Sequence, residues 1–350
     1  MQNKINGAQA INKAIYDSML KSKKVLCFGL GVTDPKGVFG TTLGLENKFG
    51  RKRVFDTPTS ENAMTGVGIG LSIGGFRPIM VHQRLDFFIL ALDQLINSAA
   101  KFYYMYGGNV NVPLVIRLII GRGWGQGPTH SQSLINLFAS IPGLKVVSPS
   151  SASSAYKLLV QSIEDPNPVV FIEHRWIHGY FDFVDNLNVK ISKLSDIDIT
   201  NYGNELAIIS TSYYSHEARI AADILNKNNI RIKVIDILTI KPLNENKIVS
   251  ELKKIKKILI LDIGFEVCSL AGHLSNLIQT KFPKDKITIK IIDSGDLSEP
   301  TSHYLTKSYY KNYEDIIKAS CRMLDIKFHY KNRSQVKYHD IPNKDFQGPF

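Results

Sequence analysis

The chain has few cysteines, no long apolar run and no recognisable targeting segment. Its three cysteines, Cys27, Cys268 and Cys321, are odd in number and widely spaced, so neither a disulfide framework nor a zinc site is indicated. No run of about 18 apolar residues occurs, so a membrane span is not expected. Residues 1–6 lack the apolar core of a signal peptide and the arginine-rich pattern of a transit peptide. These absences predict a cytoplasmic protein that does not enter a membrane.

Acidic residues are also scarce, because 43 lysines and arginines stand against 31 aspartates and glutamates in 350 residues. The net charge of +12 is explained either by nucleic-acid binding or by a composition rich in Lys, Asn and Ile throughout. The lysines do not form one long block and no nucleic-acid-binding motif occurs, which favours the second explanation. We therefore expect no nucleic-acid partner, although a basic surface can attract an acidic partner or an anionic substrate.

Hydrophobic patterning predicts two α/β domains joined by a polar linker. Apolar runs of strand length alternate with segments of helical periodicity, which is typical of a doubly wound, mostly parallel sheet. The first domain covers residues 1–190, a linker rich in Asp and Asn covers 191–204, and a second α/β domain covers 205–324. Residues 325–350 are rich in Lys, Asn and His with little periodicity, which predicts a basic tail that is extended or disordered.

The same patterns predict individual elements. Helices are expected over residues 8–20, 92–100, 134–140, 152–163, 215–226, 245–253 and 271–281. Strands are expected over residues 25–28, 53–55, 77–81, 113–117, 145–149, 169–173, 206–209, 232–235, 258–262 and 287–292. A glycine-dense loop is expected over residues 121–132, and long ordered loops in compact domains tend to be functional.

Residues 56–70 are the stretch around which the first domain is organised. Pro58 fixes a turn after a short strand, and Ser60 is suited to cap the helix that follows. That helix is rich in glycines, each of which costs about 1 kcal/mol relative to alanine. So many glycines favour the close approach of another backbone, a second subunit or a cofactor. Glu61 opens the helix where open α/β sheets bind ligands, although a carboxylate there is often only a partner of the helix dipole.

Six segments, read in order, carry a resemblance to a known family. They are Thr-Pro-Thr-Ser-Glu at 57–61, Asp-Gln-Leu-Ile-Asn-Ser-Ala-Ala-Lys at 93–101, Thr-His-Ser-Gln-Ser at 129–133, Pro-Gly-Leu-Lys-Val-Val-Ser-Pro at 142–149, Asp-Pro-Asn-Pro-Val-Val at 165–170 and Asp-Ile-Leu-Thr-Ile-Lys-Pro at 236–242. Together they resemble the beta subunit of the thiamine-diphosphate-dependent decarboxylating component of 2-oxo acid dehydrogenases. This transketolase-like family includes the pyruvate, branched-chain and acetoin enzymes. The resemblance implies a pyrimidine-binding α/β domain followed by a transketolase C-terminal-type domain.

The resemblance also implies an activity and partners. It implies an oxidoreductase subunit that decarboxylates a 2-oxo acid and passes the acyl group to lipoamide. In such enzymes thiamine diphosphate lies between subunits, and an alpha subunit holds the diphosphate and Mg²⁺ with a Gly-Asp-Gly motif that ends in paired asparagines. No such motif occurs here, which implies a separate alpha subunit in a heterotetramer of two alpha and two beta chains. A lipoyl acyltransferase is a further implied partner, and the sequence does not name the 2-oxo acid.

The family's functional residues carry over to three side chains. Glu61 matches the glutamate that hydrogen-bonds to the pyrimidine N1′ and assists proton transfer. Phe87 matches the aromatic residue that packs on the aminopyrimidine ring, with plain core packing as the alternative. His130 matches a histidine that faces the substrate and the acyl acceptor, with an incidental loop residue as the alternative.

Members of the family also hold a structural potassium ion, largely through backbone carbonyls. The matching positions are Leu114, Ser162, Ile163, Asp165 and Asn167. Side chains specify such ligands only weakly, so a turn without an ion is the alternative.

Some positions depart from the family pattern. Leu30 and Gly31 stand where acidic residues usually follow the first strand, and residues 268–271 replace a Gly-Gly pair of the C-terminal domain. Two other functions therefore stay open. One is a split transketolase-type thiamine enzyme that transfers a ketol or acyl unit to an aldehyde or sugar. The other is a non-catalytic scaffold subunit, against which the three matched side chains argue.

Overall fold

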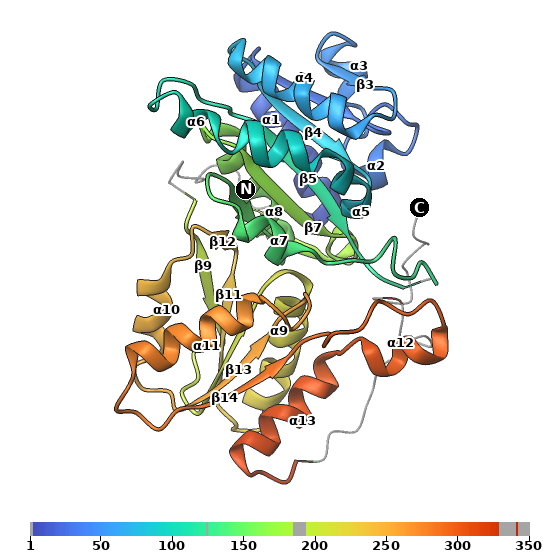
Figure 1. Cartoon of the computed structure of the whole chain (residues 1–350). Coiled ribbons are helices and arrows are strands. Elements are labelled where there is room, and N and C mark those ends of the chain that lie inside the picture. The colour runs from blue at the N-terminus through green and yellow to red at the C-terminus, as the bar shows by residue number, and fades with distance from the viewer. Residues whose placement is uncertain (1–2, 124, 185–193, 329–340, 342–350) are drawn as a thin grey trace. The chain divides into compact units, whose positions relative to one another are not determined.

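The computed structural model describes residues 3–123, 125–184, 194–328 and 341, and the chain divides into two compact α/β units (Figure 1). The first unit comprises Met1–Gly121, Leu137–Ser195 and Thr239–Pro242. The second comprises Arg122–Asn136, Asp196–Leu238 and Leu243–Phe350. Residues 239–242 of the first unit thus lie in sequence between residues of the second unit. Residues 122–136 of the second unit lie between residues of the first.

A seven-stranded sheet forms the centre of the first unit, in the order β12-β6-β7-β5-β4-β2-β3. Its strands are β2 (Val25–Gly29), β3 (Val54–Asp56), β4 (Arg77–His82), β5 (Val115–Ile120), β6 (Lys145–Val147), β7 (Val169–His174) and β12 (Thr239–Lys241). Neighbouring strands are parallel except β12, which pairs antiparallel with β6. The central strands β5 and β7 are buried along their whole length, which explains their apolar sequences. The prediction of a mostly parallel sheet is confirmed.

Helices cover both faces of this sheet (Figure 1). The helices in this part of the chain are α1 (Gly7–Lys21), α2 (Gly37–Gly40), α3 (Leu45–Phe49), α4 (Glu61–Ile73), α5 (Leu85–Phe88), α6 (Phe102–Met105), α7 (Ile135–Ser140) and α8 (Ala152–Glu164). Helices α1 and α8 pack against each other on one face, and α4 contacts β4 on the other. The helix expected over 92–100 is present, but most of it is a π-helix (Gln94–Ala99), which follows a 3₁₀ turn at Ile89–Ala91. A small antiparallel pair, β1 (Asn3–Asn6) with β8 (Phe181–Val184), was not predicted.

The second unit is built on a five-stranded sheet in the order β14-β13-β10-β11-β9. Its strands are β9 (Ile197–Thr200), β10 (Leu206–Ser210), β11 (Ile232–Ile237), β13 (Lys257–Leu261) and β14 (Thr288–Ile292). Its helices are α9 (Ser212–Asn226), α10 (Glu245–Leu252), α11 (Leu270–Lys281), α12 (His303–Tyr309) and α13 (Tyr313–Leu324). A hydrophobic cluster joins α9 and α13 to β10, β11 and β13. Strand β9 lies within the stretch expected to be a linker, and β11 pairs with it antiparallel.

Three further findings concern expectations made for the chain as a whole. The cysteines are free, and burial raises the pKa of the Cys27 thiol to about 12. Within the ranges described above, no helix has the length and apolar character needed to cross a bilayer. The tail expected to be extended or disordered, 325–350, lies mostly outside the described residues.

Candidate functional site

The carboxyl edge of the seven-stranded sheet gathers two of the predicted site residues. Because β2, β3, β4 and β5 run parallel, the segments that follow them leave the sheet at the same edge. Glu61 follows β3, Phe87 follows β4, and the glycine-dense loop follows β5. This is the edge at which open parallel sheets bind ligands.

Glu61 is the first residue of α4, and only 7% of its surface is exposed. Among the described residues its carboxylate has no hydrogen-bond or ion-pair partner, while its backbone carbonyl accepts a hydrogen bond from the Thr65 hydroxyl at 2.9 Å. Ser60 occupies the N-cap position, as predicted, but its hydroxyl makes no capping hydrogen bond. Its carboxylate oxygens are not among the fully buried polar atoms that lack a partner, so they remain accessible at the surface of the described chain. Glu61 is therefore suited to face a ligand that supplies its partner.

Two adjacent phenylalanines on α5 have opposite environments. Phe88 is fully buried, with the rings of His82 and Phe138 at 4.9 and 6.0 Å. Burial also lowers the pKa of His82 to about 4, so this histidine is a neutral core residue. Phe87, by contrast, is 41% exposed. This exposure argues against plain core packing of the Phe87 side chain.

His130 lies in the glycine-dense loop of the second unit, whereas the other two predicted side chains belong to the first unit. Its Nδ1 atom is 2.9 Å from the Thr129 hydroxyl, and its backbone N–H donates to the Gly127 carbonyl at 3.3 Å. Gly127 has a φ of +66°, and a Cβ atom there would lie 2.2 Å from the Thr301 hydroxyl oxygen. The loop needs glycine at this position because no other residue tolerates both constraints.

Arg122 anchors the start of this loop within the second unit. Its guanidinium carbon lies 4.5 Å from the ring centre of Tyr310 and 5.5 Å from that of Tyr213, which are cation–π distances. The Tyr213 hydroxyl donates to the Glu217 carboxylate at 2.5 Å. Burial raises the pKa of Glu217, although the Tyr213 hydrogen bond and Arg122 oppose the shift. Sequence reasoning did not single out Arg122, whose only signal was its place in the glycine-dense loop.

Sequence reasoning also missed a buried charged network in the first unit. Arg117 on β5 donates to Glu173 on β7 at 2.5 Å, and both side chains are almost wholly buried. His178 Nε2 lies 3.8 Å from the other Glu173 oxygen. Burial alone would raise the pKa of Glu173, but Arg117 and His178 outweigh it and hold that pKa below its ordinary value. The available signal was a single charged residue inside an otherwise apolar strand.

Two of the carbonyls expected to bind potassium accept hydrogen bonds from a cationic side chain. Arg77 Nη1 donates to the carbonyls of Ile163 and Asp165 at 2.8 and 3.1 Å. Lys145 pairs with the Asp165 carboxylate at 2.5 Å. Fixed positive charge therefore lies beside the expected ion position, which weakens the binding of a further cation.

The remaining expected ligands still have acceptor capacity. The Leu114 carbonyl accepts from the Val169 N–H at 2.9 Å, and the Ser162 carbonyl accepts from the Asp165 N–H at 3.3 Å. Since a carbonyl oxygen has two lone pairs, each of these retains one acceptor position. The Asn167 side-chain oxygen is buried and has no hydrogen-bond partner in the described part of the chain. The segment fits, at most, a weakly held monovalent cation.

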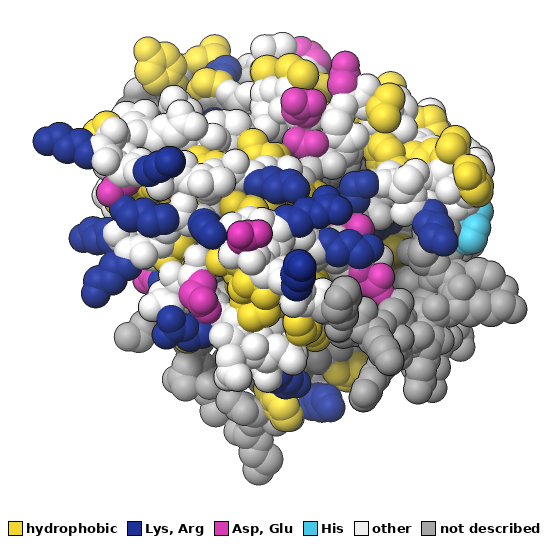
Figure 2. Space-filling view, turned by 90° about the horizontal axis from the view of Figure 1, so that it is seen from below, with side chains coloured by type: hydrophobic (Ala, Val, Ile, Leu, Met, Phe, Trp, Pro, Cys, Tyr) yellow, Lys and Arg dark blue, Asp and Glu magenta, His cyan; other side chains and the backbone are white. Residues whose placement is uncertain are grey.

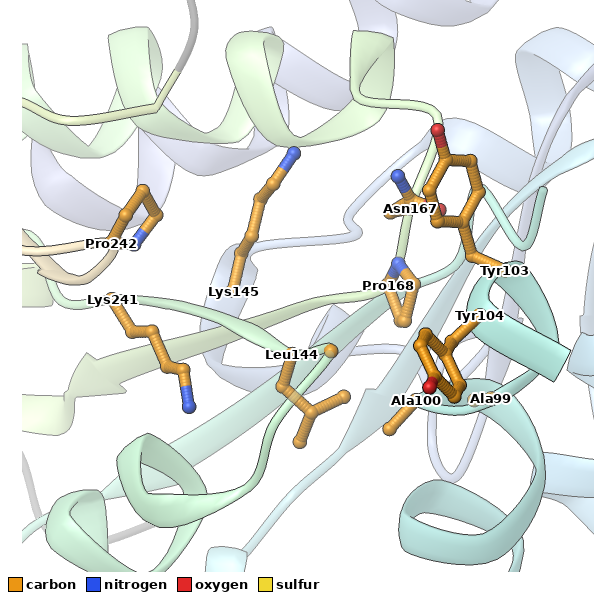
Figure 3. Close-up of a pocket in the computed structure, with 11 residues that line it drawn as sticks. Ala99, Ala100, Tyr103, Tyr104, Leu144, Lys145, Asn167, Pro168, Lys241 and Pro242 are labelled. Atoms are coloured by element: carbon orange, nitrogen blue, oxygen red, sulfur yellow. The ribbon is translucent and has the colours of Figure 1, made fainter. Parts of the chain in front are cut away.

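A cavity of about 300 Å³ opens beside this segment (Figure 3). Tyr103 and Tyr104 lie at one end of it, and the ammonium groups of Lys145 and Lys241 point to different sides. Lys241 donates to two backbone carbonyls at 2.8 Å each, and burial, with Lys101 nearby, lowers its pKa. Both lysines are thus held by protein acceptors, so the cavity presents no ready-made anion site.

Comparison with known proteins matches both units to one enzyme superfamily. Residues 3–177 match the pyrimidine-binding domain of transketolase, and residues 195–316 match the transketolase C-terminal domain. Among solved structures, a split-gene transketolase in an inactive beta4 tetramer superposes with a TM-score of 0.70 over 93% of this chain and 100% of that chain. At 16% identity this likeness shows the shared fold alone.

Curated relatives extend over nearly the whole chain. The pyruvate dehydrogenase E1 component beta subunit of Rickettsia bellii is 32% identical, over 91% of this chain and 98% of the relative. The mitochondrial beta-1 subunit of Arabidopsis thaliana is 32% identical, over 89% and 87% of the two chains. The beta subunit of the acetoin:2,6-dichlorophenolindophenol oxidoreductase of Bacillus subtilis is 34% identical, over 91% and 97%. The family predicted from the six sequence segments is confirmed, and the chain belongs to the transketolase-like beta subunits of thiamine-diphosphate-dependent 2-oxo acid dehydrogenases.

Proposed function

We propose that this chain is the beta half of an enzyme that decarboxylates a 2-oxo acid and transfers the acyl group to lipoamide. One observation carries the proposal: Glu61 is buried, begins α4 at the carboxyl edge of the sheet, and has no carboxylate partner among the residues described. A carboxylate of this kind is suited to hydrogen-bond to a ring nitrogen of a bound ligand and to exchange a proton with it.

Each matched side chain has a role in this proposal. When bound, thiamine diphosphate would supply the deprotonated carbon that serves as the nucleophile toward the carbonyl carbon of a 2-oxo acid. Glu61 would hold a proton at the pyrimidine N1′, and the exposed ring of Phe87 would pack on the pyrimidine, a contact worth about 0.5–1.5 kcal/mol. His130 would donate a hydrogen bond to the substrate carboxylate or carbonyl and pass protons during acyl transfer.

The proposal assigns the diphosphate and Mg²⁺ to an alpha subunit, in a heterotetramer of two alpha and two beta chains. The outer face of α4 supports close subunit packing, because Val67 and Ile73 are each 51% exposed and a Cβ atom at Gly70 would meet nothing within 4 Å. Potassium is proposed as a weakly held structural ion at the carbonyls of Leu114, Ser162, Ile163, Asp165 and Asn167. A lipoyl acyltransferase would take up the acyl group.

A split transketolase-type enzyme, transferring a ketol or acyl unit to an aldehyde or sugar, is the alternative. Its support is a likeness in fold at 16% identity. The dehydrogenase beta subunits share 32%, 32% and 34% of their residues with this chain over most of its length. The relatives therefore favour the dehydrogenase.

The test is to purify this chain together with its encoded alpha partner, add thiamine diphosphate and Mg²⁺, and screen 2-oxo acids with an artificial electron acceptor. We expect one or a few 2-oxo acids to reduce the acceptor. If no 2-oxo acid does so while an aldehyde or sugar is consumed as an acceptor of a two-carbon unit, the transketolase alternative is correct.

A further inference from the structure

A basic pocket of about 390 Å³ lies on the second unit, between strand β14 and helix α13. Its lining consists of Lys290, Ile292, Lys311, Asp315, Lys318, Ala319 and Arg322. None of these residues belongs to the candidate site described above. Figure 2 shows that Lys and Arg side chains are numerous on one face of the molecule.

The residue spacing along helix α13 and strand β14 places most of these side chains on one face of each element. Asp315, Lys318 and Arg322 are three and four residues apart on α13, so they share one face of that helix. Lys290 and Ile292 are two residues apart on β14, so both point to the same side of the sheet. Strand β14 is the edge of its sheet, with β13 as its neighbour. The pocket is thus bounded by one helix face and one edge strand.

The charges in the pocket are poorly balanced. Lys290, Lys318 and Arg322 have no hydrogen-bond or ion-pair partner among the residues that the structure describes. The fourth cation, Lys311, donates a hydrogen bond to a backbone carbonyl. Because a carbonyl is neutral, this contact does not balance the positive charge of the lysine. The one carboxylate, Asp315, accepts a hydrogen bond from a backbone N–H at the start of α13 at 3.2 Å. Four cations around one carboxylate create a local positive potential that an anion would relieve.

We propose that this pocket binds a small phosphorylated molecule. The Arg322 guanidinium offers a fork of donors that matches phosphate oxygens, and Lys290 and Lys318 add point charges. Ile292 and Ala319 give an apolar surface for the organic part of the ligand. The volume lies within the range of small-molecule sites, roughly 300–1,000 Å³. Because the charges converge on one cavity, a compact ligand fits better than an extended acidic peptide.

The experiment is calorimetric titration of the full chain with inorganic pyrophosphate. We expect saturable binding that weakens as potassium chloride is raised, since ionic contacts at a surface are screened. Replacing Lys318→Gln and Arg322→Gln together should weaken the binding by about tenfold or more, because each removes a hydrogen bond between charged groups. If the double variant melts at the same temperature as the parent, its weaker binding of pyrophosphate is not caused by a loss of folding.

A matched control removes the same charge elsewhere. Lys23→Gln with Lys24→Gln changes two exposed lysines of the first unit and should leave pyrophosphate binding as in the parent. An equal loss in both double variants would overturn the proposal, since it would reflect net charge alone. Binding of sulfate as tightly as pyrophosphate, or tighter binding of a short polyglutamate peptide, would also overturn it. The titration needs neither an alpha subunit nor a 2-oxo acid, so its outcome is separate from that of the proposed activity.

Discussion

At the scale of single residues, Glu61 differs from every buried carboxylate described above, because it lacks a protein partner. Glu61→Gln keeps the size of the side chain and its ability to hydrogen-bond, but it removes the group that exchanges a proton with N1′. We expect turnover, and proton–deuterium exchange at the cofactor's C2 carbon, to fall by about a hundredfold or more in the assembled complex. Folding should hardly change, since the substitution is isosteric.

His130→Ala is the comparison variant for that measurement. It should leave C2 exchange nearly intact while impairing substrate binding or acyl transfer. Exchange in Glu61→Gln that is as fast as in the parent would identify Glu61 as a helix-dipole partner only.

Arg117 is the residue whose loss should be most costly to stability. Arg117→Met would leave Glu173 buried without its ion-pair partner, and breaking such a pair costs about 3–5 kcal/mol. Urea unfolding at neutral pH measures this loss in free energy. Arg51→Met is the control, because Arg51 is 90% exposed in its ion pair with Glu46 and surface pairs contribute about 0–1 kcal/mol. Equal effects of the two variants would contradict the assignment of a structural role to the buried pair.

The same pair predicts how stability depends on pH. The pKa of Glu173 is below its ordinary value of 4.5 in the folded chain, so its contribution to stability is present above that value and is lost on acidification. The free energy of unfolding of the parent should therefore fall as pH decreases below about 5. Glu173→Gln should show a shallower fall over the same range, and an identical slope would refute the contribution of this carboxyl.

At the scale of elements, the glycines of α4 lie in two different environments, one packed against the core and one facing open space. A Cβ atom at Gly68 would lie 3.1 Å from Leu114 Cδ1 and 3.4 Å from Phe28 Cζ, whereas at Gly70 it would lie in open space. Gly68→Leu should therefore destabilise the chain by overpacking, by about 1–3 kcal/mol. Gly70→Leu should fold normally but fail to join the alpha subunit. Thermal melting and sedimentation with the alpha partner distinguish the two, and normal assembly of Gly70→Leu would argue against α4 as an interface.

Elements with strong periodicity were predictable from the sequence, and those fixed by distant contacts were not. Helices α1 and α8 were expected within one residue of their observed ends, because their apolar stripes are regular. Strand β9 alternates apolar and polar residues at a sheet edge and therefore resembled a linker, whereas β8 was not expected. The family resemblance pointed to Glu61 and Phe87 as site residues, but it left core packing open for Phe87, whose side chain is 41% exposed. Arg122 was missed because its stacking partner Tyr310 lies far along the chain.

At the scale of the whole molecule, the proposal makes this chain incomplete without its partner. The isolated chain should neither turn over substrate nor hold thiamine diphosphate tightly, because the sequence lacks the motif for the diphosphate and Mg²⁺. Calorimetry on the chain alone and with its alpha subunit measures this difference. Tight, Mg²⁺-dependent binding by the chain alone would contradict the division of the cofactor site between two subunits.

Strand β12 has a consequence for how the protein is made. It completes the first unit's sheet beside β6, but it is encoded after β11 of the second unit. On the ribosome, β6 therefore remains an open edge until residues 239–241 have emerged, and open edges invite pairing with other chains. A nascent chain that stops at residue 190 would expose that edge permanently. The sheet of the first unit is therefore complete only after β11 of the second unit has been synthesised, and a chain that ends before residue 239 lacks this edge strand.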